Sequence, residues 1–301
     1  MKIKSRWKNV DLWLYVMVLP AFLVVLIYNY IPLFGWAVAF QRYNPALGMF
    51  GSDFIGLQNF RMLFANPAFT RVIYNTVYIS AQKIVFMFFV PLIVSILLNE
   101  VMRVRYKKIL QTSIYLPFFI SWVILGGIFI SIMNPTDGVI NQILGWFGIG
   151  PIHFLGEASI FPYVVVWTDV WRSFGWGTII YMAALSTIDP GLYEAANLDG
   201  ASRFQRAWYI TIPGLVPIMV LQATLALGNV MNAGQDQILN MYNPAVYSTG
   251  DILDTFIFRR GLGDGQFAMA TAAGIFRSGI SLLFVSTAYF LAYKFAKYKI
   301  F

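Results

Sequence analysis

The stretch Glu194-Ala195-Ala196-Asn197-Leu198-Asp199-Gly200-Ala201 lies between two long apolar segments, and Ile210 and Pro213 follow it. Its alanines add little bulk, so they suit a helix that another surface approaches closely. Gly200 allows the backbone to reverse, because glycine adopts positive φ at little cost. The stretch therefore predicts two short helices that meet at Gly200.

Capping residues on both sides support this prediction. Asp189-Pro190 has the form of an N-cap followed by a first-turn proline. Ser202, with Gln205 three positions later, has the form of a capping box, in which each side chain bonds the other residue's backbone. We expect one helix to begin after Asp189 and a second after Ser202.

The composition places this polar stretch in a membrane protein. Of the 301 residues, 59% are hydrophobic and only 11% are charged. Long apolar runs that do not alternate favour helices over barrel strands, because backbone groups find no water in lipid. We predict an all-α integral membrane protein with about six transmembrane helices, each of about 20 residues or more. We place them at Leu12–Phe40, Val72–Leu98, Ile109–Met133, Ser159–Thr187, Gly214–Asp236 and Thr271–Phe295.

Lysine and arginine residues are unevenly divided between the connections. Several precede the first span, and others cluster in residues 103–108 and 203–206, whereas residues 134–158 contain none. Cytoplasmic loops carry the excess of these cations. We therefore expect both termini and the stretch Glu194–Ala201 in the cytoplasm. The first apolar run is too long for a cleaved signal and no small-x-small site follows before Gln41, so we expect it to remain as an anchor.

The Glu-Ala-Ala pattern, with Gly200 four residues after Ala196 and Pro213 thirteen after Gly200, resembles that of permease subunits in type I ATP-binding-cassette importers. The resemblance implies a cytoplasmic coupling helix between the fourth and fifth spans that docks on a separate ATPase. It assigns this coupling to Glu194, Ala195, Ala196, Asp199, Gly200, Ala201, Ile210 and Pro213. It also implies an anchor helix and external loop over residues 1–71, and a five-helix transmembrane domain over 72–297 with its coupling loop at 188–213. The alternative is an ordinary amphipathic loop between membrane helices.

Further motifs are similar to those of the branch that imports carbohydrates, closest to permeases for complex oligosaccharides. They are Phe54–Phe60, Asn75–Thr76, Tyr115–Pro117, Trp171–Trp176 and Ile188–Tyr193. The resemblance implies uptake of an oligosaccharide or polysaccharide fragment through the bacterial inner membrane by alternating access. It implies a second, homologous permease in a heterodimer, two ATPase subunits that hold ATP and Mg²⁺, and an extracytoplasmic solute-binding protein. The net charge of +8 needs no nucleic acid to explain it.

Charged side chains inside a predicted span are expected to face the bundle interior or a water-filled path, because they are costly in lipid. Asp169 and Arg172 are three residues apart and share a face of the fourth span. Two interpretations are open: a structural ion pair, or part of a translocation path. Lys83 and Arg277, in the second and sixth spans, either pair with acids on neighbouring helices or extend toward an interface.

Polar residues also recur along the predicted fifth span. At intervals of three and four they form a stripe on one helix face, which also includes one leucine; its members are Gln222, Leu225, Asn229, Asn232 and Asp236. Amides and carboxylates exchange hydrogen bonds with sugar hydroxyls, so the stripe is a candidate substrate path. The alternative is that these amides bind neighbouring helices. Gly228 and Gly234 are positions where this helix is free to kink or unwind.

Aromatic residues of the fourth span extend the candidate path. Trp167 and Trp171 are one helical turn apart, and Tyr181 follows them. Such rings stack on sugars, because a pyranose presents C–H groups to an aromatic face. The alternative is that they pack or face lipid, as most membrane aromatics do.

Enzymatic functions find no support in the sequence. No Gly-x-x-x-x-Gly-Lys-Ser/Thr motif occurs, so we expect no ATPase site and no catalytic residue in this chain. There is no cysteine and His153 is the single histidine, so we expect no metal site and no cofactor bound by the chain itself. Two other classes stay open: an ion-coupled secondary transporter that uses Asp169 and Arg172, and a membrane scaffold that transports nothing.

Overall fold

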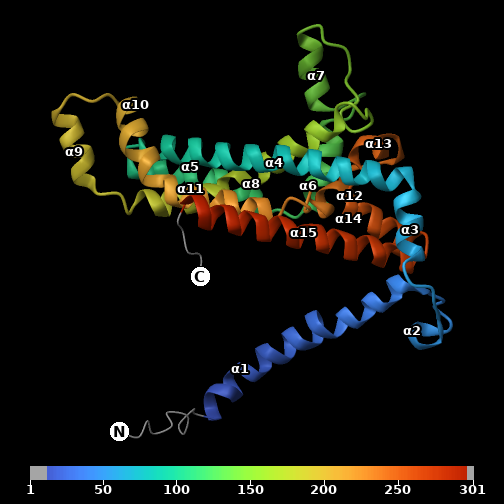
Figure 1. Ribbon diagram of the computed structural model, residues 1–301. Coiled ribbons are helices and arrows are strands. Elements are labelled where there is room, and N and C mark those ends of the chain that lie inside the picture. The colour runs from blue at the N-terminus through green and yellow to red at the C-terminus, as the bar shows by residue number, and fades with distance from the viewer. Residues whose placement is uncertain (1–11, 297–301) are drawn as a thin grey trace, which may run out of the picture. The chain divides into compact units, whose positions relative to one another are not determined.

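The computed structural model describes the backbone of residues 12–296 and the side chains of residues 14–290. The described chain is mainly helical, with two short strands (Figure 1). It divides into two compact units. The smaller unit comprises the described part of Met1–Ala65 together with Arg260–Ile275, and the larger comprises Asn66–Arg259 with the described part of Phe276–Phe301.

The smaller unit begins with one long apolar helical run. Its N-terminal elements are α1 (Leu12–Val25), η1 (Leu26–Tyr30), η2 (Ile31–Phe40), β1 (Gln41–Arg42), α2 (Gly48–Gly51), β2 (Asp53–Phe54) and α3 (Gln58–Ala65). The strands pair antiparallel, with Gln41 opposite Phe54. Asn59 of α3 donates to the carbonyls of Ala39 and Gln41 at 2.8 and 2.9 Å, which fixes α3 on the end of the helical run.

The larger unit is a helical bundle with short helices at both ends. Its first half consists of α4 (Pro67–Asn99), α5 (Val104–Tyr115), η3 (Leu116–Phe119), α6 (Trp122–Ile132), α7 (Val139–Trp146) and α8 (Phe161–Leu185). Its second half consists of α9 (Pro190–Leu198), α10 (Arg203–Arg206), η4 (Ala207–Thr211), α11 (Ile212–Gly228), α12 (Gln235–Met241), η5 (Pro244–Val246), α13 (Tyr247–Gly250) and α14 (Leu253–Phe258). The last two elements, η6 (Arg259–Gly263) and α15 (Phe267–Ala296), contain residues of both units.

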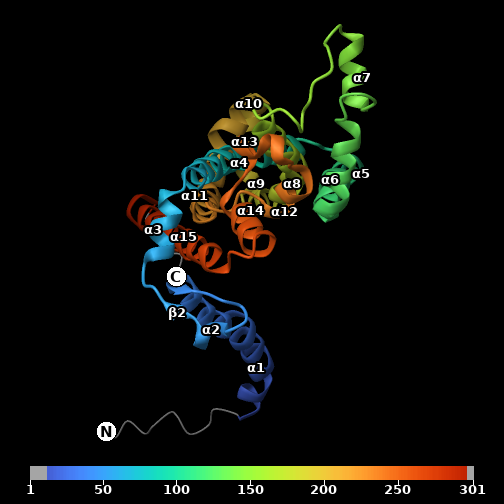
Figure 2. The same ribbon diagram turned by 90° about the vertical axis from the view of Figure 1, so that its right-hand side faces the viewer.

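The ends of this bundle differ in the elements that they carry. Figure 1 shows α9 and α10 at one end and α12, α13 and α14 at the other, while α7 stands away from the other helices in both views (Figures 1 and 2). A polar turn and a group of short helices are therefore separated by the length of α4 and α8.

Helices α4 and α8 lie side by side at the centre of the larger unit. Glycines of α8 allow its neighbours to approach: a Cβ on Gly175 would collide with the carbonyl of Ile114, and a Cβ on Gly177 would lie 2.8 Å from Pro91. Small residues serve this purpose where helices pack in membranes. The buried apolar cluster joins α4, α6, α8 and α12 through residues such as Ile79, Leu125, Val165 and Ile238.

Four helices among the described residues are long and apolar enough to cross a membrane: three correspond to the predicted first, second and sixth spans, and one overlaps the first part of the predicted fifth. They are Leu14–Phe40, Pro67–Asn99, Arg203–Gly228 and Phe267–Phe290. The predicted fourth span is the single helix α8, whose 25 residues also have sufficient length. Its polar residues give α8 a lower hydropathy than the other four, and it is not one of these candidates.

The prediction of one continuous third span, Ile109–Met133, is wrong. The helices Val104–Phe119 and Trp122–Ile132 meet there at 99° and form a fifth candidate only as a bent pair. The backbone is extended at Ile120 and Ser121, and Ser121 begins α6 by accepting a bond from the Ile124 amide at 3.4 Å. The chain bends because a serine N-cap starts a new helix inside the apolar run.

The prediction of a continuous fifth span that ends at Asp236 is also wrong. Helix α11 ends at Gly228, and α12 begins at Gln235 after Gly234, whose φ is +94°. Such a backbone is costly for residues other than glycine. Asn229 and Asn232 therefore lie in a non-helical segment and Asp236 lies on a different helix, so the polar stripe of one helix face does not exist.

Candidate functional site

The turn between α9 and α10 has the predicted local structure. The Asp189 carboxylate accepts from the Gly191 amide at 2.9 Å at the start of α9. The Ser202 hydroxyl accepts from the Gln205 amide at 3.3 Å, and the Ser202 amide donates to the Gln205 side chain at 2.7 Å. Gly200 has φ of +75°. Both caps and the reversal at Gly200 are confirmed.

A few polar contacts hold this turn to the bundle. The hydroxyls of Tyr193 and Thr211 are 3.0 Å apart, which ties α9 to the segment before α11. Arg206 donates to Asn197 across the turn and lies 3.8 Å from Glu100 at the end of α4. These contacts are few and lie at the base of the turn, where the Tyr193–Thr211 bond is partly buried, and the outer side of the turn is exposed.

The residues assigned to coupling lie mainly on that outer side. Glu194, Ala195, Asp199, Gly200 and Pro213 are exposed, while Ala196, Ala201 and Ile210 are half-buried. Two apolar side chains on the same turn were not predicted from the sequence: Leu198 is 90% exposed and Phe204 is 76% exposed. These two side chains add exposed apolar surface to the turn beside the charged Glu194 and Asp199.

A polar cavity of about 390 Å³ lies near the break between α11 and α12. It is lined by Trp122, Arg172, Asn232, Gly234, Gln235, Asp236, Gln237, Asp254 and Arg277. Three of the predicted path residues, Arg172, Asn232 and Asp236, meet here. The unwound segment and the short helix α12 supply most of the lining, so the break places amides and a carboxylate at the cavity.

Arg172 does not pair with Asp169, as the first interpretation required. Its Nε and Nη2 donate to the carbonyls of Ile120 and Phe118 at 3.1 and 3.0 Å. Its Cζ lies 5.3 Å from the centre of the Phe118 ring and 5.0 Å from that of Trp122, which are cation–π distances. Arg172 therefore braces the bend between α5 and α6.

Asp169 pairs instead with Lys83, one of the two options left open for this lysine. The Lys83 ammonium is 2.8 Å from Asp169, and it donates to the Ala233 carbonyl at 2.8 Å and to Gln237 Oε1 at 2.6 Å. Gln237 in turn donates to Thr168 at 2.7 Å. This network, which we call the Lys83 network, joins α4, α8 and α12 and bonds the Ala233 carbonyl of the unwound segment.

Arg277 also pairs with an acid on a neighbouring helix. Its Nε lies 3.0 Å from Asp254 Oδ1 at one wall of the polar cavity. Burial raises the pKa of Asp254 above its ordinary value, and the Arg277 guanidinium opposes that rise. This pair therefore brings no net charge to the cavity while Asp254 is ionised.

The remaining predicted path residues divide between a second cavity and the surface. Tyr181, Gln222 and Asn229 line a largely apolar cavity of about 290 Å³ beside Trp176 and Phe118. Trp167 packs on Phe86 with ring centres 4.6 Å apart, and Trp171 packs on Phe129 at 5.8 Å. Both tryptophans are about half exposed, and neither lines the two cavities.

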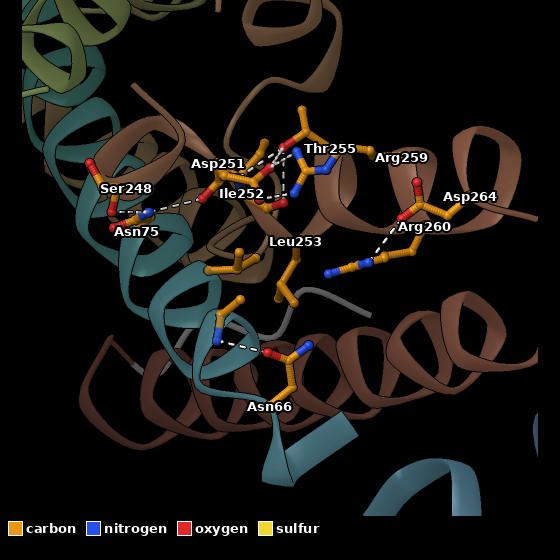
Figure 3. A network of polar contacts seen from close by, with 12 residues as sticks. Asn66, Asn75, Ser248, Asp251, Ile252, Leu253, Thr255, Arg259, Arg260 and Asp264 are labelled. Atoms are coloured by element: carbon orange, nitrogen blue, oxygen red, sulfur yellow. Dashed lines mark hydrogen bonds and ion pairs between the residues drawn. The ribbon is translucent and has the colours of Figure 1, made fainter. Parts of the chain in front are cut away.

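A further polar network fixes the segment before α14 and was missed by the sequence analysis (Figure 3). Asn75 of α4 donates to the carbonyls of Ser248 and Asp251 at 3.2 and 3.0 Å. Arg259 contacts both carboxylate oxygens of Asp251, at 3.0 and 2.5 Å. Burial raises the pKa of the adjacent Tyr242 to about 12. The network holds α14, and so Asp254, on α4.

Comparison with known proteins identifies the family. The model of the family described as "Binding-protein-dependent transport system inner membrane component" matches residues 91–234, which include the turn, the Lys83 network's residues on α8 and the unwound segment. The chain belongs to this family of permeases. Its members are inner-membrane components of transport systems, which agrees with the spans described above.

Relatives match along almost the whole chain. Protein LplB of Bacillus subtilis is 38% identical and the match covers 95% of this chain and 90% of LplB. The polygalacturonan/rhamnogalacturonan transport system permease protein YteP of the same organism is 37% identical over 95% of this chain and 89% of its own. A solved chain of a bacterial ABC transporter involved in the import of the acidic polysaccharide alginate has a TM-score of 0.88 and 35% identity, over 95% and 96% of the two chains.

Proposed function

We propose that this permease carries a saccharide into the cytoplasm as one subunit of an ATP-driven importer. The observation that carries the proposal is the exposed α9–α10 turn, in a family whose members depend on a binding protein. The surface of the turn consists of Glu194, small residues and the exposed side chains of Leu198 and Phe204. Such a surface suits a partner that supplies energy, since the sequence contains no phosphate-binding loop of its own.

The nature of the cavity and of the relatives supports a saccharide as cargo. Amides, a carboxylate and the Trp122 ring line the polar cavity, and this combination bonds hydroxyls and stacks on a sugar face. YteP is named for transport of polygalacturonan and rhamnogalacturonan, and the solved transporter is named for import of alginate. We infer an oligosaccharide or polysaccharide fragment as the substrate.

The complete assembly follows from the family and from the distribution of cations. We infer six spans that include α8, both termini and the α9–α10 turn on the cytoplasmic side, and a bacterial inner membrane as the location. A second permease, two ATPase subunits that bind ATP and Mg²⁺, and an extracytoplasmic solute-binding protein complete the importer. Alternating access then requires that ATP favour one arrangement of the spans over the other.

A continuous helical run gives the route from the turn to the cavity. Residues Arg203–Gly228 form one run of 26 residues, which begins at the turn and ends where the unwound segment starts. The contact between Tyr193 and Thr211 couples α9 to this run. A displacement of the turn is therefore passed along α11 to Asn232 and its neighbours at the cavity.

A charge reversal at Glu194 tests this proposal. The Glu194→Lys variant and the control Asp53→Lys, an exposed acid far from the turn in sequence, are each reconstituted with their partners in proteoliposomes. We expect Glu194→Lys to lower ATP-driven saccharide uptake about 10-fold or more, because one charge contact is worth on the order of 1.5–3 kcal/mol. Asp53→Lys should leave uptake unchanged. Normal uptake and normal saccharide-stimulated ATP hydrolysis in Glu194→Lys would refute docking at this turn.

A further inference from the structure

Three cations of the larger unit lie at or beside the polar cavity, and their partners differ. Lys83 is 2.8 Å from Asp169, and Arg277 is 3.0 Å from Asp254. Arg172 forms no ion pair among the described residues, and its hydrogen bonds go to two neutral carbonyls. Its positive charge therefore has no carboxylate of its own.

The guanidinium of Arg172 is held in place by its neighbours, but not all of its N–H donors have a partner within the described part of the chain. It has five N–H donors. The carbonyls of Phe118 and Ile120 take one bond each, from Nη2 and Nε, and the rings of Phe118 and Trp122 hold the plane of the group. The described residues thus leave the Nη1 donors available to an acceptor in the cavity that Arg172 lines.

We propose that Arg172 binds the carboxylate of an acidic saccharide as it passes through the polar cavity. This inference rests on the proposed function and adds the charge class of its substrate. The planar guanidinium matches a carboxylate in geometry, and such charged hydrogen bonds are stronger than neutral ones. Arg277 is unsuited to this task, because Asp254 already occupies it.

Asp236 restricts how the saccharide lies in the cavity. It is exposed at the same cavity and forms no ion pair among the described residues. Its carboxylate repels a second carboxylate and accepts hydrogen bonds from hydroxyls. The acidic group of the substrate is therefore directed to Arg172, and the sugar hydroxyls face Asp236 and the amides of Asn232 and Gln235.

The test compares two saccharides that differ only at C6, where one carries carboxylates and the other neutral hydroxymethyl groups. The probes are α-1,4-linked trigalacturonate and its carboxyl-reduced counterpart, α-1,4-linked galactotriose, and uptake is measured in proteoliposomes with the complete importer and ATP. We expect Arg172→Gln to lower trigalacturonate uptake by about 10- to 100-fold, the range for loss of a hydrogen bond to a charged group. Galactotriose uptake by this variant should fall several-fold less than trigalacturonate uptake, because a neutral sugar has no carboxylate to form an ion pair with Arg172 and loses only a hydroxyl bond to the guanidinium.

Several results would overturn the inference. They are an equal fall for both saccharides in Arg172→Gln, unchanged trigalacturonate uptake, or a parent protein that imports galactotriose and not trigalacturonate. The last of these leaves the proposed function intact. A parent importer that takes up neither saccharide with ATP counts against the proposed function as well.

Two further variants cover the case in which Arg172→Gln fails to assemble, which copurification with the ATPase reveals. Arg172→Lys keeps the charge and should retain more trigalacturonate uptake than Arg172→Gln. Asp236→Asn removes the repelling charge without touching the bend at Ile120, and it should raise uptake of trigalacturonate relative to galactotriose. An unchanged or lower ratio in Asp236→Asn overturns the inference by itself.

Discussion

The α9–α10 turn and the segment between α11 and α12 each interrupt a helical path at a glycine with positive φ, but they are held in opposite ways. At Gly200 the supporting bonds come from residues close in sequence, such as Ser202. At Gly234 they come from Lys83, which donates to the Ala233 carbonyl 150 residues away. The first break is a local structure at the surface, whereas the second is a tertiary structure built around a buried charge.

This difference separates a part that can move from a part that keeps its shape. The turn meets its base through contacts such as the Tyr193–Thr211 bond and the Arg206–Glu100 pair, each worth on the order of 1 kcal/mol or less, so it can shift against its base at little cost. Removing one partner of a buried ion pair costs several times as much, because the other charge is left buried. The cavity walls near Gly234 are therefore rigid, and the turn is the adaptable end of the same helical run.

The largest expected effect is at the centre of the rigid region. Lys83→Met leaves Asp169 without its partner and frees the Ala233 carbonyl, so we expect a loss of about 3–5 kcal/mol in unfolding free energy. Denaturant unfolding of the purified protein in detergent measures it. Lys107→Met, a lysine of α5, is the control and should change stability by less than about 0.5 kcal/mol. The double variant Lys83→Met/Asp169→Asn should recover part of the loss, and equal stability of Lys83→Met and parent would show that the network does not hold the break.

A smaller effect is expected from alanine substitutions at the two glycines, which compare the two breaks directly. Alanine at Gly200 meets nothing within 4 Å, so Gly200→Ala should cost only the strain of positive φ, about 1–2 kcal/mol. A Cβ at Gly234 would lie 2.8 Å from Lys83 Nζ, so Gly234→Ala should cost more than Gly200→Ala by displacing the lysine. The unfolding free energies of the two variants, measured in detergent, test whether Gly234→Ala costs more. Equal losses of stability in the two variants would mean that only the strain of positive φ matters at Gly200 and Gly234, and that the contact with Lys83 adds nothing.

The smallest effect belongs to the cap of α10. Ser202→Ala removes the bond to the Gln205 amide, which should cost about 1 kcal/mol within the turn alone. Amide hydrogen exchange should accelerate about fivefold in α10 and stay unchanged in α12. Ser113→Ala, an exposed serine of α5, serves as the matched control. Faster exchange in α12 after Ser202→Ala would join the two regions into one cooperative structure and remove the contrast between them.

The same contrast explains which features could be predicted from the sequence. The caps at Asp189 and Ser202 depend on bonds two or three residues apart, and such short spacings are readable directly. The long apolar runs are equally local and were found as helices. Leu198 and Phe204 were not predicted, although two large apolar residues within a polar turn are a signal that the sequence contains.

The errors concern contacts between distant parts of the chain. Periodicity joined Asn229, Asn232 and Asp236 into one stripe, because nothing near them in sequence shows that Lys83 holds Gly234 in a turn. Spacing paired Asp169 with Arg172, whereas the partners that the fold provides are Lys83 and the carbonyls of the α5–α6 bend. The bond between Asp251 and Arg259 has a short spacing, but its purpose appears only with Asn75 beside it.

The helical run Arg203–Gly228 also limits how the gene for this protein can change. At about 1.5 Å and 100° per residue, one inserted residue lengthens the rod slightly but rotates everything beyond it by more than a quarter circle. The cavity lining beyond the insertion would then be rotated about the helix axis relative to the turn, so the two would no longer have their present relative orientation. Substitutions at exposed positions of α11 are thus expected to be tolerated. Insertions and deletions between Pro213 and Gly228 are expected to abolish transport unless they restore the helical phase.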